Sequence, residues 1–327
     1  MASFPPADLE PMLAAHADWS IDPRKRWVSR AWRKNGKWHA AAPLPVGDPA
    51  ALLAALAADG AALGAPAVLG LDLPLGLPRG FAAGRGERDF PAFLRGLQQD
   101  AAFFEVSAGL DTVSPERPFY PTRGLRGMTR AAHAAALGLT GPAALNRWCD
   151  LATAERPAGA PLFWTLGANQ TGKAAISAWR GWLCSALRSS APPRLWPFDG
   201  SLRDLLAPGR VVLAETYPAE AMRHLGVVLG GSKRSSEARR RAGPFITLAM
   251  ARLGAVAEPA LAAAIESGFG ADAAAEDRFD SVLGLLCVIG VLEGARPDFI
   301  PADPWVRRWE GWVLGQTALP PAAIQPG

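Results

Sequence analysis

The residues best suited to chemistry are the acids at the start of AEDRFDSVLGLLCVIGVLEG, residues 275–294. On a helix, Asp277, Asp280 and Gly284 are spaced by three or four residues and share one side. Cys287 continues this stripe into the apolar part of the segment. A carboxylate that faces an apolar interior is costly without a partner, and no Lys or Arg of this segment lies on the stripe. The pattern predicts that a cation from elsewhere meets these acids.

Three further acids stand at or near the ends of predicted strands. Asp18 lies in LAAHADWS, Asp72 follows the apolar run APAVLGL, and Glu215 ends RVVLAE. Two divalent ions that activate a water and stabilise the leaving oxygen of a phosphodiester need several carboxylates from different elements, and Mg²⁺ prefers oxygen ligands. We therefore expect these acids to be catalytic together with the two acids of residues 275–294. The expected ligands of Mg²⁺ or Mn²⁺ are Asp18, Asp72, Asp277 and Asp280, with Glu215 as a further ligand or a base.

Each of these acids also has an ordinary structural interpretation. Asp72, which precedes Leu73-Pro74, could cap a turn, and Glu215 could pair with a surface arginine. Asp277 could be an acid favoured at a helix N-terminus by the helix dipole. Only their combined order along the chain favours a shared site.

A second motif is GANQTGKA, residues 167–174, which nearly matches the phosphate-binding loop G-x-x-x-x-G-K-[ST]. Ala174 stands where a Ser or Thr hydroxyl would hold Mg²⁺. Three interpretations are open: a nucleotide-binding loop, a helix start whose turn is formed by Gly and Thr, and a helix N-terminus at which Asn169 and Lys173 bind a backbone phosphate.

Basic residues cluster in TRGLRGMTR, residues 122–130, and in SKRSSEARRR, residues 232–241. A planar guanidinium can bind two phosphate oxygens, which favours a role in binding nucleic acid. A solvated helix face is the alternative. The residues expected to bind substrate phosphates, besides Asn169 and Lys173, are Lys233, Arg234, Arg239 and Arg240.

Composition limits the class of protein. The chain has 327 residues, of which 50% are hydrophobic, and a formal net charge of +4, which permits a polyanionic partner without requiring one. Its three cysteines are far apart and lack the spacing of a zinc site, so we expect buried thiols in a cytoplasmic protein. No uncharged apolar stretch reaches about 18 residues, which predicts no membrane span.

The elements that must position these acids can also be predicted. A hairpin is predicted around Lys34-Asn35-Gly36, with RWVSRAW and KWHAAAPL as its two strands. Together with LAAHADWS, these segments are expected to form three antiparallel strands. Asp48-Pro49 begins a helix expected to end at Gly60. APAVLGL and RVVLAE predict buried parallel strands.

The rest of the chain is expected to be largely helical. Residues 80–205, rich in Gly, Pro and Arg, predict an insertion or cap with helices near 91–104, 141–154 and 173–188. A helix near 218–226, a further helical pair and the helix of residues 275–294 complete the order.

This order of elements is that of the ribonuclease H-like fold. The segments GLDLPLGLP, NQTGKAA, LWPFDG, AETYPAEA and DRFDSVLGLL resemble those of domain of unknown function 429, a group predicted to be nucleases of that fold. The resemblance extends from about Asp18 to Glu293. It implies one α/β domain over residues 1–327, with a mixed five-stranded sheet flanked by helices and a large insertion, residues 80–205, between the fourth and fifth strands.

The expected function is a metal-dependent nuclease of the two-metal-ion type that hydrolyses a phosphodiester of DNA or RNA. Two alternatives stay open. One is a phosphoryl-transfer enzyme that binds a nucleotide, either at residues 167–174 or through an ATPase-like use of the core fold. The other is a non-catalytic module that binds nucleic acid through its arginines alone.

Overall fold

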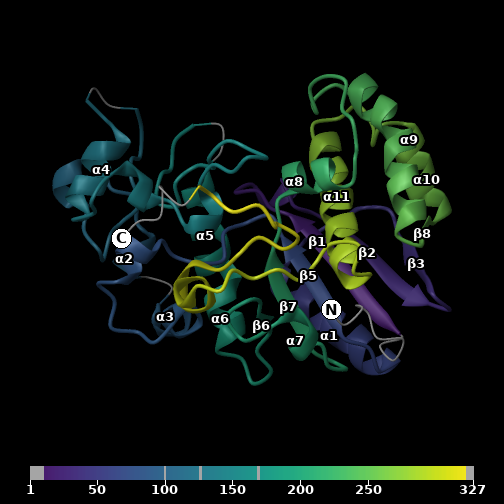
Figure 1. Ribbon diagram of the computed structural model, residues 1–327, viewed down its shortest axis with the longest axis horizontal. Helices are drawn as coiled ribbons and strands as arrows, with labels where there is room; N and C mark the ends of the chain where they lie inside the picture. Colours follow the sequence, from purple (N-terminus) through teal and green to yellow (C-terminus); the bar gives the residue numbers. More distant parts are fainter. Residues whose placement is uncertain (1–10, 99–100, 125–126, 168–169, 322–327) are drawn as a thin grey trace.

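The structure is a computed structural model that describes residues 11–98, 101–124, 127–167 and 170–321. Its centre is one mixed sheet with helices on both faces (Figure 1). In spatial order the strands are β6 (Arg194–Leu195), β7 (Val211–Glu215), β5 (Ala67–Leu71), β1 (Met12–Asp18), β2 (Trp27–Lys34), β3 (Lys37–Ala40) and β8 (Ala255–Ala257), and β4 (Leu44–Pro45) pairs with β2.

The α/β class and the mixed, helix-flanked sheet are confirmed. The strands β1, β5, β7 and β6 run parallel, as do β3 and β8, whereas β2 is antiparallel to β1, β3 and β4. The described sheet has eight strands, however, and not five. The additional strands β4, β6 and β8 contain only two or three residues each, too few for a side-chain alternation that the sequence could reveal.

The predicted hairpin turn and the predicted start of the first helix are both found in the structure. The loop between β2 and β3 places Asn35 at φ 52° and Gly36 at φ 73°, as a two-residue hairpin turn requires. Asp48 caps α1 (Pro49–Leu63) by accepting a hydrogen bond from the Ala50 amide. The predicted end of this helix at Gly60 is wrong, because the left-handed residue that ends it is Gly64, at φ 64°.

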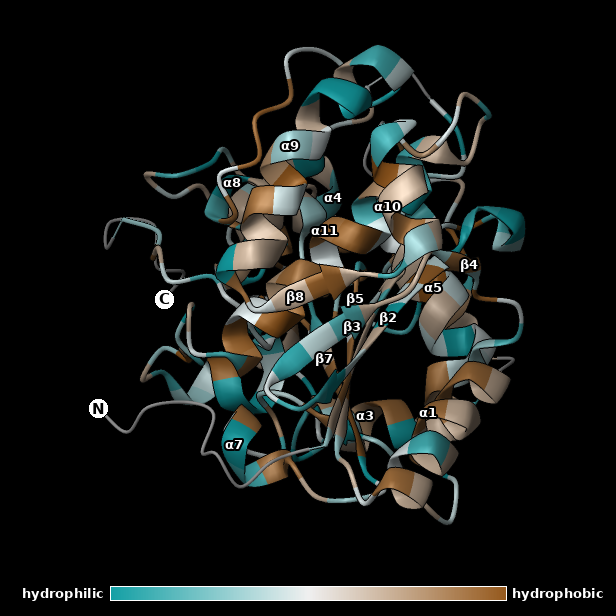
Figure 2. Ribbon diagram, turned by 90° about the vertical axis from the view of Figure 1, so that its right-hand side faces the viewer, coloured by the Kyte–Doolittle hydropathy of each residue, from teal (hydrophilic) through white to brown (hydrophobic). Residues whose placement is uncertain are grey.

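The sheet separates two hydrophobic cores. Successive side chains of β1 alternate between them, with Leu13 and Ala15 in one core and Met12 and Ala14 in the other. The first core lies under α1 and most of residues 79–205. The second lies under α8 (Pro218–His224), α9 (Ser236–Arg252), α10 (Pro259–Glu266) and α11 (Ala275–Leu292). Figure 2 shows hydrophobic residues concentrated along α11, next to the sheet, while hydrophilic residues colour the outer turns of α9.

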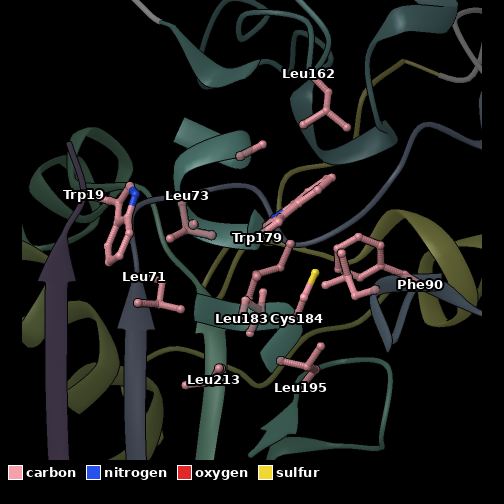
Figure 3. Packing of buried hydrophobic residues seen from close by; sticks show 14 of the residues in the cluster. Trp19, Leu71, Leu73, Phe90, Leu162, Trp179, Leu183, Cys184, Leu195 and Leu213 are labelled. Atoms are coloured by element: carbon pink, nitrogen blue, oxygen red, sulfur yellow. The ribbon is translucent and has the colours of Figure 1, made fainter. Parts of the chain in front are cut away.

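Residues 80–205 separate β5 from β7 in the chain and pack largely on the α1 face. Trp179 and Leu183 extend from this segment toward Leu73 and Leu213 at the sheet (Figure 3). Its regular helices are α2 (Arg79–Ala82), α3 (Phe90–Gly96), α4 (Arg130–Ala136), α5 (Thr171–Ala178), α6 (Cys184–Leu187) and, close to its end, α7 (Leu202–Leu205). Short 3-10 turns and a π-helical turn join them.

Two of the three helices predicted in this segment need correction. The helix near 173–188 exists as α5, a π-helical turn at Trp179–Leu183, and α6. Near 91–104, α3 already ends at Gly96. The prediction at 141–154 is wrong: only 3-10 turns form there, at Pro142–Leu145 and Trp148–Asp150.

The helices and the cysteines of the described ranges were also compared with the expectations from the sequence. None of the helices in these ranges is long and apolar enough to cross a membrane. All three cysteines are free and buried, as predicted.

Candidate functional site

Two of the predicted aspartates lie side by side at the carboxyl ends of neighbouring strands. Asp18 is the last residue of β1, and the Asp72 amide donates a hydrogen bond to the Ala17 carbonyl, which extends the β1–β5 pairing by one residue. Alternation along β1 puts Asp18 on the same face as Met12, Ala14 and His16. This is the face that α11 covers.

A close approach of α11 to the sheet positions Asp280. His16 is fully buried against Gly284, where a Cβ atom would lie only 2.2 Å from its Nε2. Any larger residue at Gly284 would therefore force the helix away from β1. Ser281 further fixes the helix through a hydrogen bond of 2.8 Å between its Oγ and that of Ser29 on β2. Asp280, one turn before Gly284, consequently faces the ends of β1 and β5.

Burial and mutual repulsion raise the pKa of each of these acids. Burial raises the pKa of Asp18 well above its usual range, and Asp280, Asp72 and Asp277 raise it further. Burial, followed by the charge of Asp280, raises the pKa of Asp72 to about 7, while Lys233 opposes the shift. Asp18, Asp72 and Asp280, from three different elements, thus belong to one group of acids that repel one another.

Only one of these carboxylates has a partner. The Lys233 ammonium, from the loop before α9, lies 2.8 Å from Oδ1 and 2.7 Å from Oδ2 of Asp280. Within the described ranges, no hydrogen-bond donor or ion-pair partner reaches the carboxylate of Asp18, which is 7% exposed, or that of Asp72. Two desolvated carboxyl groups are thus left without a partner, which favours either their protonated form or a bound cation.

Asp277 lies at the edge of this group. Burial raises its pKa to about 6, and the nearby Lys25 lowers it. Its Oδ2 atom is buried without a hydrogen-bond partner. Although the four aspartates influence one another, no three His, Cys, Asp or Glu side chains of the described residues are arranged as a ready-made metal site. The convergence of five acids on one point is therefore not found.

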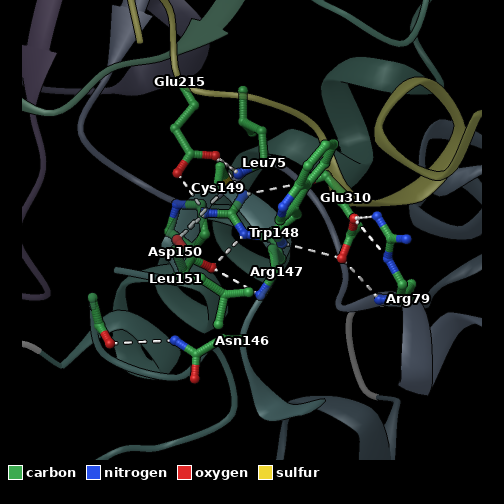
Figure 4. A network of polar contacts seen from close by, with 12 residues as sticks. Leu75, Arg79, Asn146, Arg147, Trp148, Cys149, Asp150, Leu151, Glu215 and Glu310 are labelled. Atoms are coloured by element: carbon green, nitrogen blue, oxygen red, sulfur yellow. Dashed lines mark hydrogen bonds and ion pairs between the residues drawn. The ribbon is translucent and has the colours of Figure 1, made fainter. Parts of the chain in front are cut away.

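Glu215 lies on the opposite face of the sheet. It pairs with Leu71, one residue before Asp72, so its side chain points away from the aspartates. Its oxygens accept hydrogen bonds of 2.6 Å from both terminal nitrogens of Arg147, and one of them also accepts the Leu75 amide (Figure 4). The next residue, Thr216, points to the aspartate side of the sheet instead. Its side chain lies close to Gly70, as does that of His16.

The partner of Glu215 was not predicted from the sequence. Arg147 is fully buried and also bonds both oxygens of Asp150, at 2.9 and 3.0 Å, and Asp150 accepts a hydrogen bond of 2.6 Å from the Tyr217 hydroxyl. These contacts are made from the 3-10 turn at Trp148–Asp150 and the residue before it, where a helix was expected. The one available signal was an Arg and an Asp three residues apart in the apolar stretch ALNRWCD.

Asp72 and Asp280 line a cleft of about 1010 Å³, whereas Asp18 and Asp277 do not. Its walls come from the ends of β1 and β5, residues 156–160, the start of α5 and the start of α8. Its charged lining residues are Lys25, Asp72, Arg156, Glu220, Arg223, Lys233, Glu276 and Asp280. Positive and negative groups are equal in number, so the cleft is not a broadly cationic groove.

The near-match to a phosphate-binding loop is the start of a helix. α5 begins at Thr171, and a Cβ atom at Gly172 would lie 2.8 Å from the Leu162 carbonyl oxygen, so close packing accounts for this glycine. Gln170 and Thr171 line the cleft, whereas Lys173 does not. Asn169 lies outside the described residues.

Most of the predicted phosphate ligands of residues 232–241 have other partners. Arg239 is 1% exposed and donates to the carbonyls of Gly268 and Gly270 at 2.8 and 2.7 Å, so it is not available to a phosphate. Arg240 pairs with Glu237 on the same helix. Arg234 is exposed, 3.9 Å from Glu276, and Lys233 holds Asp280.

Comparison of the chain with protein-family models, with curated proteins and with solved structures finds no match.

Proposed function

We propose that this protein is a divalent-metal-dependent nuclease, a hydrolase that cleaves phosphodiester bonds of nucleic acid. The supporting observation is a pair of neighbouring carboxylates, the buried Asp18 and the half-buried Asp72, that have no partner among the described residues and lie beside a large cleft, which Asp72 lines. Structural acids are normally paired or hydrogen-bonded, as Glu215 is here. Two that are not paired, next to a third acid, suit a cation that arrives from solution.

The donor set suits Mg²⁺ or Mn²⁺. Mg²⁺ commonly takes one or two carboxylates and completes its coordination with water and substrate phosphates, so Asp18 and Asp72 can hold it without a third ligand. When bound, such an ion would activate a water and stabilise the leaving oxygen. The chain itself orients the two carboxylates through the β1–β5 pairing, and Lys233 neutralises Asp280 beside them.

The ribonuclease H-like fold belongs to the same proposal. The middle of the sheet, in the order β3, β2, β1, β5 and β7 with only β2 antiparallel to the rest, is compatible with the core that the resemblance to domain of unknown function 429 implies. Residues 80–205 would then be its insertion, within a single domain.

The test is cleavage of labelled single-stranded DNA, duplex DNA, RNA and RNA–DNA hybrid in Mg²⁺, in Mn²⁺ and in chelator. We expect metal-dependent cleavage of at least one substrate, and a loss of about 100-fold or more in Asp72→Asn, the usual effect of removing a group that acts in the transition state. Asp59→Asn, an exposed acid of α1, serves as the matched control.

Other outcomes distinguish the alternatives. Binding of nucleic acid that persists in chelator, without cleavage of any substrate, would favour a non-catalytic module. ATP hydrolysis that Lys173→Ala abolishes would favour phosphoryl transfer at residues 167–174. Cleavage unaffected by Asp72→Asn would remove the site described above.

A further inference from the structure

Lys233 lines the cleft, and other residues hold both its backbone and its ammonium group. The side chain is 23% exposed and its ammonium contacts both oxygens of Asp280. The Lys233 carbonyl accepts a hydrogen bond from the buried guanidinium of Arg239, which is itself anchored on Gly268 and Gly270. The position of Lys233 is thus held by Arg239 at its backbone and by Asp280 at its ammonium group.

The charges beside Lys233 fit one divalent ion better than two. The carboxylates of Asp18, Asp72 and Asp280 carry three negative charges when ionised, and the ammonium carries one positive charge. One divalent ion neutralises the remainder, whereas a second would give this desolvated group an excess of positive charge. A second ion would also have to compete with the ammonium for both oxygens of Asp280, and breaking a largely buried pair is unfavourable.

We propose, as a refinement that rests on the proposed function, that the site binds a single divalent ion at Asp18 and Asp72, and that Lys233 takes the place of the second ion. This replaces the two-ion arrangement expected from the sequence. In this arrangement Asp280 would hold the Lys233 ammonium in place, and the ammonium would supply a fixed positive charge to the substrate phosphate.

The test counts bound Mn²⁺ per chain by electron paramagnetic resonance of the free ion during a titration. The variants are Lys233→Gln, which removes the charge, Lys233→Arg, which keeps it, and Lys37→Gln, an exposed lysine of β3, as the control. Circular dichroism checks that each variant is folded. We expect one ion in the wild type, in Lys233→Arg and in the control, and a second ion in Lys233→Gln because Asp280 is then free.

Contrary results separate the refinement from the function on which it rests. Two ions in the wild type, or the same single ion with unchanged affinity in Lys233→Gln, would overturn the role given to Lys233 and leave the metal-dependent function standing. Absence of Mn²⁺ binding in every protein, at millimolar concentrations, would overturn both. If Lys233→Gln is not folded, Lys233→Met provides the same charge removal with a side chain of similar length.

Discussion

At the scale of single residues, the acids at the ends of the strands and in the loops around them are of two kinds, paired and unpaired. Glu215 and Asp150 share a buried arginine, whereas Asp18 and Asp72 have no partner among the described residues. Replacing Asp280 should relieve little of the repulsion among these acids, because its carboxylate is paired with Lys233. The relief should come from the acids without partners.

Asp72→Asn should therefore stabilise the metal-free protein at pH 7 and reduce its response to metal. In chelator we expect a melting temperature at or above that of the wild type, because the change removes a repelled, desolvated charge. An ion at about a hundred times its Kd stabilises a protein that binds it only when folded by roughly 2.7 kcal/mol, and the variant should gain far less. Thermal melts in chelator and in millimolar Mn²⁺ measure both effects. A destabilised variant together with a wild type that ignores Mn²⁺ would contradict the interpretation.

The raised pKa of Asp72 also predicts how stability depends on pH without metal. The carboxyl group ionises near pH 4 in the unfolded chain but near pH 7 in the folded protein, so between these values the folded state binds more protons. The free energy of unfolding should thus fall as pH rises from 4 to 7, by about 1–3 kcal/mol after allowance for coupling to Asp18 and Asp280. Urea denaturation in chelator at pH 5 and pH 7 measures the slope. Asp72→Asn should flatten it, and an unchanged slope would mean that other groups produce it.

At the scale of elements, the position of α11 depends on one glycine. Gly284→Ala would bring a Cβ atom into contact with the fully buried His16, and we expect a loss of about 1–3 kcal/mol, as for other overpacked cores. Gly290→Ala in the same helix is the matched control, since the nearest atom there would be 3.8 Å away. This control should be neutral or slightly stabilising because Ala favours a helix.

Urea denaturation of the two variants measures the difference. His16→Ala should recover part of the loss when combined with Gly284→Ala, because it removes the atoms in contact. Equal stability of the Gly284 and Gly290 variants would show that α11 can move away from β1 at little cost, and that the contact does not position Asp280.

Elements with strong local signals were predictable from the sequence, and those that depend on distant charges were not. The hairpin at Asn35-Gly36, the cap at Asp48 and the strands that carry Asp18 and Asp72 follow from turn chemistry and apolar runs. The contact of Arg147, within the segment 141–154, with Glu215 could not be predicted, because the two residues are 68 positions apart. The same holds for the site, where Asp280 was identified but its pair with Lys233, 47 residues before it, was not.

The misplaced acid has a simpler cause. Glu215 was assigned to the site because it ends a strand, but the side-chain alternation of β7, once paired with β5, puts it on the far face. Pairing register between distant strands is what a single sequence does not show.

At the scale of the whole molecule, the even charge balance of the cleft limits how the proposed nucleic-acid substrate can bind. Among its lining cations, Lys233 is paired with Asp280, Arg156 with Glu220, and the Arg223 guanidinium donates to a backbone carbonyl. Lys25, at the exposed edge near Asp277, forms no ion pair within the described part of the chain. Few phosphates can therefore be neutralised at once.

Binding of a single-stranded oligonucleotide should accordingly depend only weakly on salt. With about two phosphate contacts, the slope of log K against log salt concentration should lie between about −1 and −2. Lys25→Ala should reduce its magnitude by about 0.7, while Lys37→Ala, on the exposed hairpin, should leave it unchanged. Fluorescence anisotropy at several salt concentrations measures the slope. A slope of about −4 or steeper would indicate an extended cationic surface outside the cleft.

The central sheet has one further consequence for this balance of charge. Leu71 and Asp72 are neighbours in the chain, yet alternation points Asp72 toward α11 and leaves the adjacent Glu215 beside Arg147 on the other side. The sheet thus separates Glu215, whose charge is met by Arg147, from Asp18 and Asp72, which have no partner among the described residues. If Arg147 lay on the same side of the sheet as Asp18 and Asp72, its guanidinium would pair with them. No unpaired carboxylate would then remain at the cleft to bind a cation.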